Sequence, residues 1–245
     1  MLKKLCLYAG FFMLATSAMA GTVNEEALKR NLKKLAPAVA QAGTVDYKSG
    51  CATCAQIGIK DEHALLVSKD NNQKIDLTII TEEEANAAFA DIVARGDIPF
   101  EYIKDGCYSR AHKMALVLDD KGITSGKAFL EGQIYYDAGK QGEVGWSYQV
   151  APVVLVKKGG QAVPYVIDPS LFNKAVPLEE WKAKLTKKSK TKITREYFTN
   201  RFSYDIRDRD SKYNDYQEDQ LNDMDDTNKN MMRALYVQNA SNQRR

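Results

Sequence analysis

The spacing of hydrophobic and polar residues along the chain predicts a mixture of helices and strands. Apolar residues at helical spacing predict helices at 24–41, 81–94, 107–121, from 177 onward and around 231–236. Apolar or alternating β-prone runs predict strands at 63–68, 74–80, 127–136, 146–157, 163–168 and 196–204. Thr81 and Glu84 match a capping box, which marks the start of the second helix. Together the elements predict an α+β fold with a mostly antiparallel sheet flanked by helices.

One hairpin makes a prediction about register. The sequence at 158–161, with two central glycines, is typical of a two-residue turn between antiparallel strands. Pairing its two ends places Ala151 opposite Asp168 and Gln149 opposite Ser170. Gln149 and Asp168 would then be diagonal neighbours on one face of the sheet, close enough for their side chains to meet.

The first 20 residues have the pattern of a secretory signal. Lys3 and Lys4 precede an apolar run that ends in Ala18-Met19-Ala20, so cleavage is expected before Gly21. We therefore expect export through a Sec-type signal peptide, to the periplasm or outside the cell. The apolar run is short for a bilayer span and no later window is comparable, so no membrane span is expected in the mature protein.

The mature chain is divided into three parts. Residues 21–77 form an N-terminal helix and hairpin segment, 78–210 a core, and 211–245 a polar C-terminal helix and tail. The net charge of +3 includes two lysines in the signal, which contains no acid, so the mature chain is close to neutral. This balance indicates no nucleic-acid partner.

The mature chain keeps three cysteines. Cys51 and Cys54 form a C-x-x-C pair with no second pair to complete a zinc site, which favours a local disulfide or a weak redox role over a metal. A disulfide between them would leave Cys107 as the odd cysteine of an exported protein. An unpaired thiol in that setting calls for an explanation, and reactivity is one.

Cys107 follows a tight turn and begins a helix. A thiol there meets the positive end of the helix dipole and the unpaired amides of the first turn, which favour a thiolate nucleophile. Ala111 and Met114 continue the apolar stripe toward the interior. The polar residues between them are expected to point elsewhere: Arg110, His112 and Lys113. The alternative is a buried core cysteine with no chemical role.

Three segments carry a family resemblance: 105–114 (DGCYSRAHKM), 146–151 (WSYQVA) and 167–172 (IDPSLF), with Trp181 beyond them. In their order and spacing, over about residues 78–185, they resemble the bacterial secreted protein-glutaminase (protein-glutamine deamidase) family. The resemblance implies a papain- or transglutaminase-like core. It also implies hydrolysis of the side-chain amides of protein glutamines through a cysteine thioester, with no metal or cofactor.

The resemblance assigns roles to three positions. The nucleophile falls on Cys107 and the orienting acid on Asp168, whereas the position of the general-base histidine holds Gln149. A carboxamide does not titrate near neutral pH, so Gln149 can only hold a hydrogen bond. The resemblance also suggests that residues 21–77 are a pro-segment that covers the cleft.

Neither histidine of the chain is expected to replace the base. His112 lies five residues after Cys107, roughly 140° around the helix, and should face away from the thiol. His63 lies on a strand outside the matching segments. Trp146 and Tyr148 are candidate walls of the substrate cleft, although such aromatics are often core residues.

Three functions remain open. The first is a cysteine hydrolase acting on a protein or peptide substrate that bears glutamine. The second is a catalytically inactive relative, a pseudoenzyme, that binds a protein or peptide in the retained cleft. The third is a thiol-redox role for Cys51 and Cys54.

Overall fold

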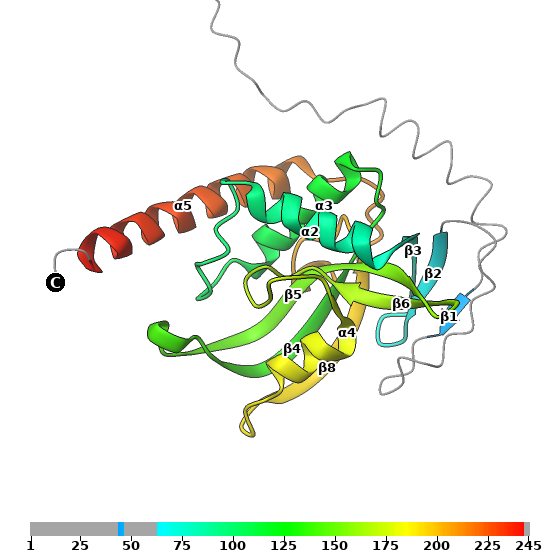
Figure 1. Cartoon of the computed structure of the whole chain (residues 1–245), viewed down its shortest axis with the longest axis horizontal. Helices are drawn as coiled ribbons and strands as arrows, with labels where there is room; N and C mark the ends of the chain where they lie inside the picture. The colour runs from blue at the N-terminus through cyan, green and yellow to red at the C-terminus, as the bar shows by residue number, and fades with distance from the viewer. Residues whose placement is uncertain (1–43, 47–62, 243–245) are drawn as a thin grey trace, which may run out of the picture.

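The computed structural model describes residues 44–46 and 63–242 of the 245-residue chain (Figure 1). The strands are β1 (Thr44–Asp46), β2 (His63–Ser68), β3 (Gln73–Ile80), β4 (Gly126–Asp137), β5 (Glu143–Lys158), β6 (Gln161–Val166), β7 (Val176–Pro177) and β8 (Lys192–Asn200). The helices are α2 (Glu82–Ala94), α3 (Cys107–Asp120), α4 (Leu178–Leu185) and α5 (Glu218–Asn242). The signal, the helix expected at 24–41 and the Cys51–Cys54 pair lie outside the described residues.

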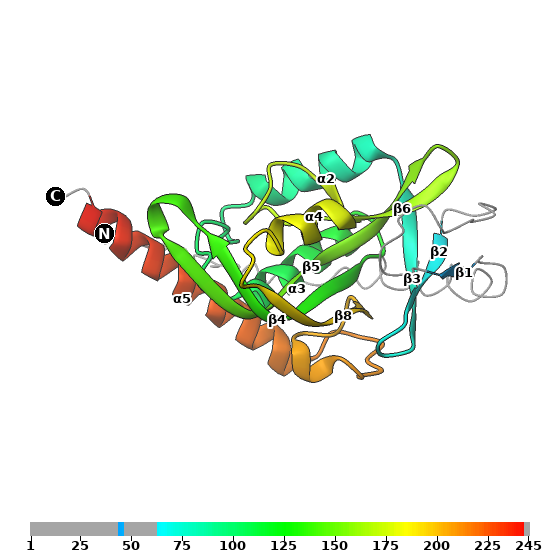
Figure 2. The same cartoon turned by 90° about the horizontal axis from the view of Figure 1, so that it is seen from below.

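The strands form one sheet in the order β1-β2-β3-β5-β4-β8, with β6 on β5 and β7 on β6. The pairs β1–β2 and β3–β5 are parallel, and the other pairs are antiparallel. Helices α2 and α3 cover one face and α4 covers the other (Figures 1 and 2). The predicted α+β fold with a mostly antiparallel sheet is therefore confirmed.

Strand β5 is the centre of this arrangement because both of its faces are buried. Val153 and Leu155 pack with Trp181 of α4 in one apolar cluster. Val154 and Val156 belong to a second cluster with residues of α2 and α3. A strand covered on both sides is expected to be apolar at every position, as this one is from Val150 to Val156.

The start of α2 has the predicted cap. Thr81 Oγ1 accepts a hydrogen bond from the Glu84 amide at 3.1 Å, and Glu84 Oε2 accepts one from the Thr81 amide at 2.7 Å. Two of the amides that a helix start leaves unpaired are thereby satisfied. Among the described helices, none is both long and apolar enough to cross a membrane.

The strand predicted at 196–204 is displaced along the chain. Strand β8 begins at Lys192 and ends at Asn200, so both of its ends lie four residues earlier than predicted. The Asn200 side chain accepts hydrogen bonds from the amides of Phe202 and Ser203 at 3.0 and 3.3 Å. This side-chain turn stops the strand, which the alternating aromatic residues alone did not indicate.

The C-terminal helix packs against the core over its first half. α5 lies beside α3, and it buries Met224, Asn228 and Met231 at a four-then-three spacing (Figure 1). Its sequence is strongly polar, which led to the prediction of only a short helix around 231–236. The narrow buried stripe explains how a polar 25-residue helix is held in place.

Candidate active site

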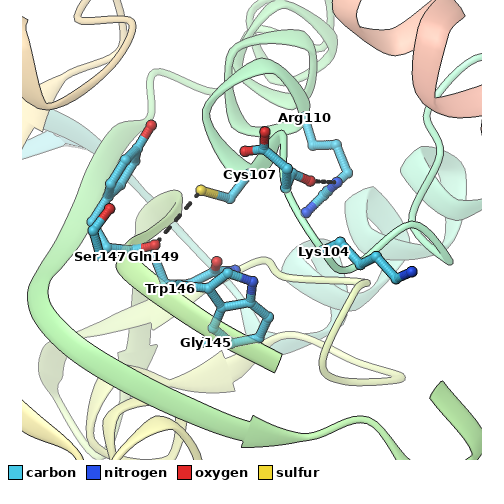
Figure 3. A pocket seen from close by; sticks show the side chains of 9 residues that line it. Lys104, Cys107, Arg110, Gly145, Trp146, Ser147 and Gln149 are labelled. Carbon is cyan, nitrogen blue, oxygen red and sulfur yellow. Dashed lines mark hydrogen bonds between the residues drawn. The ribbon is translucent and has the colours of Figure 1, made fainter. Parts of the chain in front are cut away.

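The turn before α3 delivers Cys107 to the first position of the helix. Gly106 adopts the left-handed conformation with φ of 78°, and no side chain caps the helix start. The Gly106 amide donates to Asp105 Oδ1 at 2.6 Å, which orders the turn. The thiol faces β5 across a small pocket (Figure 3). Amides of the first helical turn thus lie beside the thiol without a capping side chain.

The Cys107 thiol is buried, with 8% of the residue exposed. It donates a weak hydrogen bond to the carbonyl oxygen of Tyr148, with 4.0 Å between the two atoms. Burial raises the pKa of Cys107 to about 12, although the Arg110 guanidinium acts in the opposite direction. Burial therefore acts against the thiolate that the helix start was predicted to favour.

Gln149 and Asp168 meet, as the hairpin register predicted. The Gln149 side-chain amide donates to Asp168 Oδ2 at 3.0 Å, and the Trp181 indole N–H donates to the same oxygen at 2.9 Å. Burial raises the pKa of Asp168, which the two donors partly counteract. The carboxyl group is therefore held between β5 and α4.

The register itself is confirmed only up to the end of β6. Lys158 pairs with Gln161, the ladder runs to Val153 and Val166, and the Ile167 amide still donates to the Pro152 carbonyl oxygen at 3.0 Å. Beyond it, the Asp168 carbonyl accepts hydrogen bonds from two amides of the following turn, at 3.1 and 3.0 Å. The predicted pairs further along are replaced by this turn, which still leaves the Asp168 side chain within reach of Gln149.

The pocket beside Cys107 has a volume of about 140 Å³. Trp146, Tyr148 and Gln149 line it from β5, as expected for cleft residues. The Trp146 indole N–H donates to the carbonyl oxygen of Ile103 at 2.9 Å, which ties β5 to the segment before the cysteine. A space this size holds one side chain, well below the size of pockets for drug-like ligands.

His112 faces away from the thiol, as predicted from its helical position. Its Nδ1 lies 2.7 Å from Lys127 Nζ, and the rings of Tyr204 and Tyr216 pack edge-on against it. Burial and the nearby Lys127 lower the pKa of His112 to about 2. His63 pairs with Asp76 at 3.0 Å on the β2–β3 hairpin.

Arg110 is a correction to the sequence interpretation. It was expected to point away from the interior, but only 3% of it is exposed. Its Nη1 donates to the carbonyl oxygens of Tyr102 and Asp105 at 2.7 and 2.8 Å, and it contacts the sulfur of Met231 at 3.4 Å. The same guanidinium therefore holds the turn before Cys107 and a residue of α5. His112 is likewise fully buried.

Comparison with known proteins supports the relation that the motifs indicated. Residues 84–185 match the family model described as glutaminase. The NMR structure of protein-glutaminase from Chryseobacterium proteolyticum is 28% identical, with a TM-score of 0.50 over 59% of this chain and 84% of that one. The chain is similar to the protein-glutaminases in motifs and in fold.

Two further protein-glutaminase structures match. A crystal structure of protein-glutaminase is 27% identical over 58% of this chain and 85% of that chain, with a TM-score of 0.49. A crystal structure of pro-protein-glutaminase is 31% identical over 51% of this chain and 49% of that chain, with a TM-score of 0.47. The chain thus spans about half the length of the pro-protein-glutaminase structures. No curated protein matches it.

Two contacts of this protein-glutaminase-like site were missed from the sequence. A buried indole N–H is expected to have a hydrogen-bond acceptor, so the sequence could predict that Trp181 donates a hydrogen bond. It could not predict that the acceptor is Asp168. The contact of Arg110 with Met231 joins residues far apart in the chain and has no local signal. Within 63–242 no group of three or more His, Cys, Asp or Glu residues is arranged to hold a metal.

The contact between Gly106 and Met231 predicts a measurable stability difference. Gly106→Ala is expected to lower the free energy of unfolding by about 2 to 3 kcal/mol, because a Cβ at φ of 78° is strained and the end of the buried Met231 side chain would have to shift to make room for it. Gly122→Ala is the matched control, with φ of 75° and open space around it, and should cost about 1 to 2 kcal/mol. Urea unfolding measures both. Equal losses would mean that Met231 does not constrain the turn.

Proposed function

We propose that this chain is an exported relative of the protein-glutaminases that binds a glutamine side chain of a protein or peptide in the Cys107 pocket and does not turn it over. One observation carries the proposal: the residue that lines the Cys107 pocket and donates a hydrogen bond to the buried acid Asp168, at 3.0 Å, is Gln149. A protein partner that displays glutamine is the ligand we expect.

The lack of turnover follows from the proton transfers that amide hydrolysis needs. Attack by the Cys107 sulfur on a carboxamide requires the thiol proton to leave, and expulsion of ammonia requires a proton to arrive. Gln149 can do neither, since a carboxamide does not titrate near neutral pH. With the pKa of Cys107 at about 12, thiolate is scarce as well. Both histidines of the chain are engaged elsewhere.

Binding is supported by the shape of the site. A pocket of about 140 Å³ admits a single side chain, and Trp146 and Tyr148 form its wall on β5. Amides of the first turn of α3 can donate to a carboxamide oxygen. The site therefore keeps features that hold an amide and lacks the group that would drive its hydrolysis.

The test is a binding and turnover experiment on the same protein. A polar peptide with one glutamine should bind, and the same peptide with asparagine, glutamate or alanine should bind more weakly, measured by fluorescence anisotropy. Ammonia release should stay at the background rate. Cys107→Ala should keep the binding, because the sulfur is not the main contact. Equal affinity for all four peptides would contradict the proposal.

A slow hydrolase is the second candidate, favoured by the retained Cys107 and Asp168. In this reaction the sulfur bonds to the amide carbon, the thiol proton leaves with ammonia, and water then hydrolyses the thioester to glutamate and free thiol. Ammonia release above background that Cys107→Ala abolishes would establish it.

We also propose export with cleavage before Gly21, to the periplasm or outside the cell. A removable pro-segment would have to end before β2, because Ala64, Leu66, Ile75 and Leu77 are buried in the core cluster of the sheet. N-terminal sequencing of the protein from fractionated cells tests both statements. A mature start after residue 77 would contradict the second.

A further inference from the structure

The exposed large apolar side chains of the described residues gather in one place. Val93 at the end of α2 is 48% exposed, and Met232 and Tyr236 of α5 are 41% and 77% exposed. Val237, next to them on α5, is 62% exposed. The other exposed residue of this kind in the described ranges, Ile206, lies on a different segment. A patch of several such residues is characteristic of an interaction surface.

Three of these side chains, Val93, Met232 and Tyr236, border a groove between α2 and α5 of about 560 Å³. Its apolar lining comes from both helices and the segment after α2: Val93, Ile98, Pro99, Met232, Leu235 and Tyr236. The volume falls within the range of ligand-binding clefts. The groove can therefore receive at least one large apolar side chain.

The groove adjoins a second hollow that leads toward the active site. Phe100, Glu101 and Pro169 line both spaces. Pro169 directly follows Asp168, the buried acid of the site. The groove and the second hollow are thus continuous with each other at Pro169, in the turn after β6.

The second hollow in turn borders the Cys107 pocket. Tyr136 and Ile103 line the hollow. The Tyr136 ring stacks on Trp146 with 5.6 Å between ring centroids, and the Trp146 N–H donates to the Ile103 carbonyl. Trp146 lines the Cys107 pocket itself. The Cys107 pocket, the hollow and the groove are thus neighbours in that order, with Trp146 between the first two, and a path from the thiol to α5 would pass over this side chain.

We propose that the polypeptide whose glutamine enters the Cys107 pocket continues along this path and places an apolar side chain, several residues from the glutamine, in the groove between α2 and α5. The inference rests on the proposed function and specifies a second feature of the partner, an apolar side chain at a fixed distance from the glutamine. A polypeptide has both features that the path requires, a polar side chain for the narrow pocket and an apolar one for the wide groove. The partner is an extended, glutamine-containing segment with an apolar anchor.

The test uses labelled peptides and the mature chain. Each peptide carries one glutamine in a polar background and one leucine or phenylalanine at an offset of two to ten residues on either side. Fluorescence anisotropy should find one favoured offset that binds about tenfold to a hundredfold more tightly than the peptide without the apolar residue. The double variant Met232→Ser, Tyr236→Ser should lose this gain and keep its affinity for the polar glutamine peptide.

Ile206→Ser is the matched control, an exposed apolar residue away from the path, and should retain the full gain. A gain that survives in the double variant, or that does not depend on the offset, would overturn the inference and leave the proposed function intact. If the apolar residue still increases affinity after the peptide's glutamine is replaced by alanine, then the groove binds without a glutamine in the Cys107 pocket. That result would contradict the proposed function and, with it, the inference. Analytical ultracentrifugation that finds a dimer for the wild type and a monomer for the double variant would show that the groove binds a second copy of the chain. This result would also overturn the inference.

Discussion

Replacing Gln149 with histidine is expected to raise the rate of ammonia release from glutamine-containing proteins by about 100- to 10,000-fold, the usual contribution of a general base. The reason is positional. Asp168 already accepts a hydrogen bond from residue 149 and would orient an imidazole in the same way. The introduced ring could take the thiol proton, deliver it to leaving ammonia and then activate water.

The measurement compares four proteins in one ammonia assay: wild type, Gln149→His, and each of these with Cys107→Ala. Activity should appear only in Gln149→His with the cysteine intact. Gln149→Asn is a suitable control, because it shortens the amide without adding a base. A folded Gln149→His protein that stays at background would show that Cys107, Asp168 and residue 149 are not a catalytic unit.

The second large effect is expected in the rate at which iodoacetamide alkylates Cys107. Iodoacetamide reacts with the thiolate, and burial disfavours this charged form, so the pKa lies at about 12 in the folded protein. The rate should rise about tenfold per pH unit from pH 7 to pH 10 with no plateau. At neutral pH it should be about 1,000-fold or more below that of an ordinary thiol with a pKa of about 8.5.

Mass spectrometry of the peptide that contains Cys107 separates its reaction from those of Cys51 and Cys54. The urea-unfolded protein supplies the comparison, since there the same thiol is solvated and its rate should level off above about pH 9. In Gln149→His the folded protein should level off at lower pH, as an imidazole beside the sulfur favours the thiolate. A plateau below pH 9 in the wild type would mean that the helix start stabilises the thiolate after all.

The parts of the site that could be predicted from sequence depend on short-range rules. A two-residue turn at 158–161 sets the register, and the period of two carries that register along the strands. This was enough to bring Gln149 to Asp168, although the ladder ends before either residue. The capping box of α2 and the glycine turn before Cys107 are equally local.

The remainder depends on segments that meet only in the folded protein. Arg110 and His112 were placed away from the interior because nothing local indicated that Met231 of α5 would cover the first and that Tyr204 and Tyr216 would cover the second. The ionisation of Cys107 was misjudged for the same reason: the dipole of a helix can be inferred from its first residues, whereas the degree of burial cannot. Strand β8 was shifted because the stop signal was a side chain of Asn200.

The contact of Met231 with the turn at Gly106 has a consequence for the order in which the protein assembles. A ribosome makes residue 106 long before residue 231, so the turn that presents the cysteine must wait for more than a hundred further residues before its last neighbour exists. The family match ends at residue 185 and does not include that neighbour. A fragment that ends at residue 185 would lack Met231. Arg110 would lose its contact with the Met231 sulfur, and the turn at Gly106 would no longer be covered by that side chain. The turn that presents the thiol is therefore completed by α5, more than a hundred residues further along the chain.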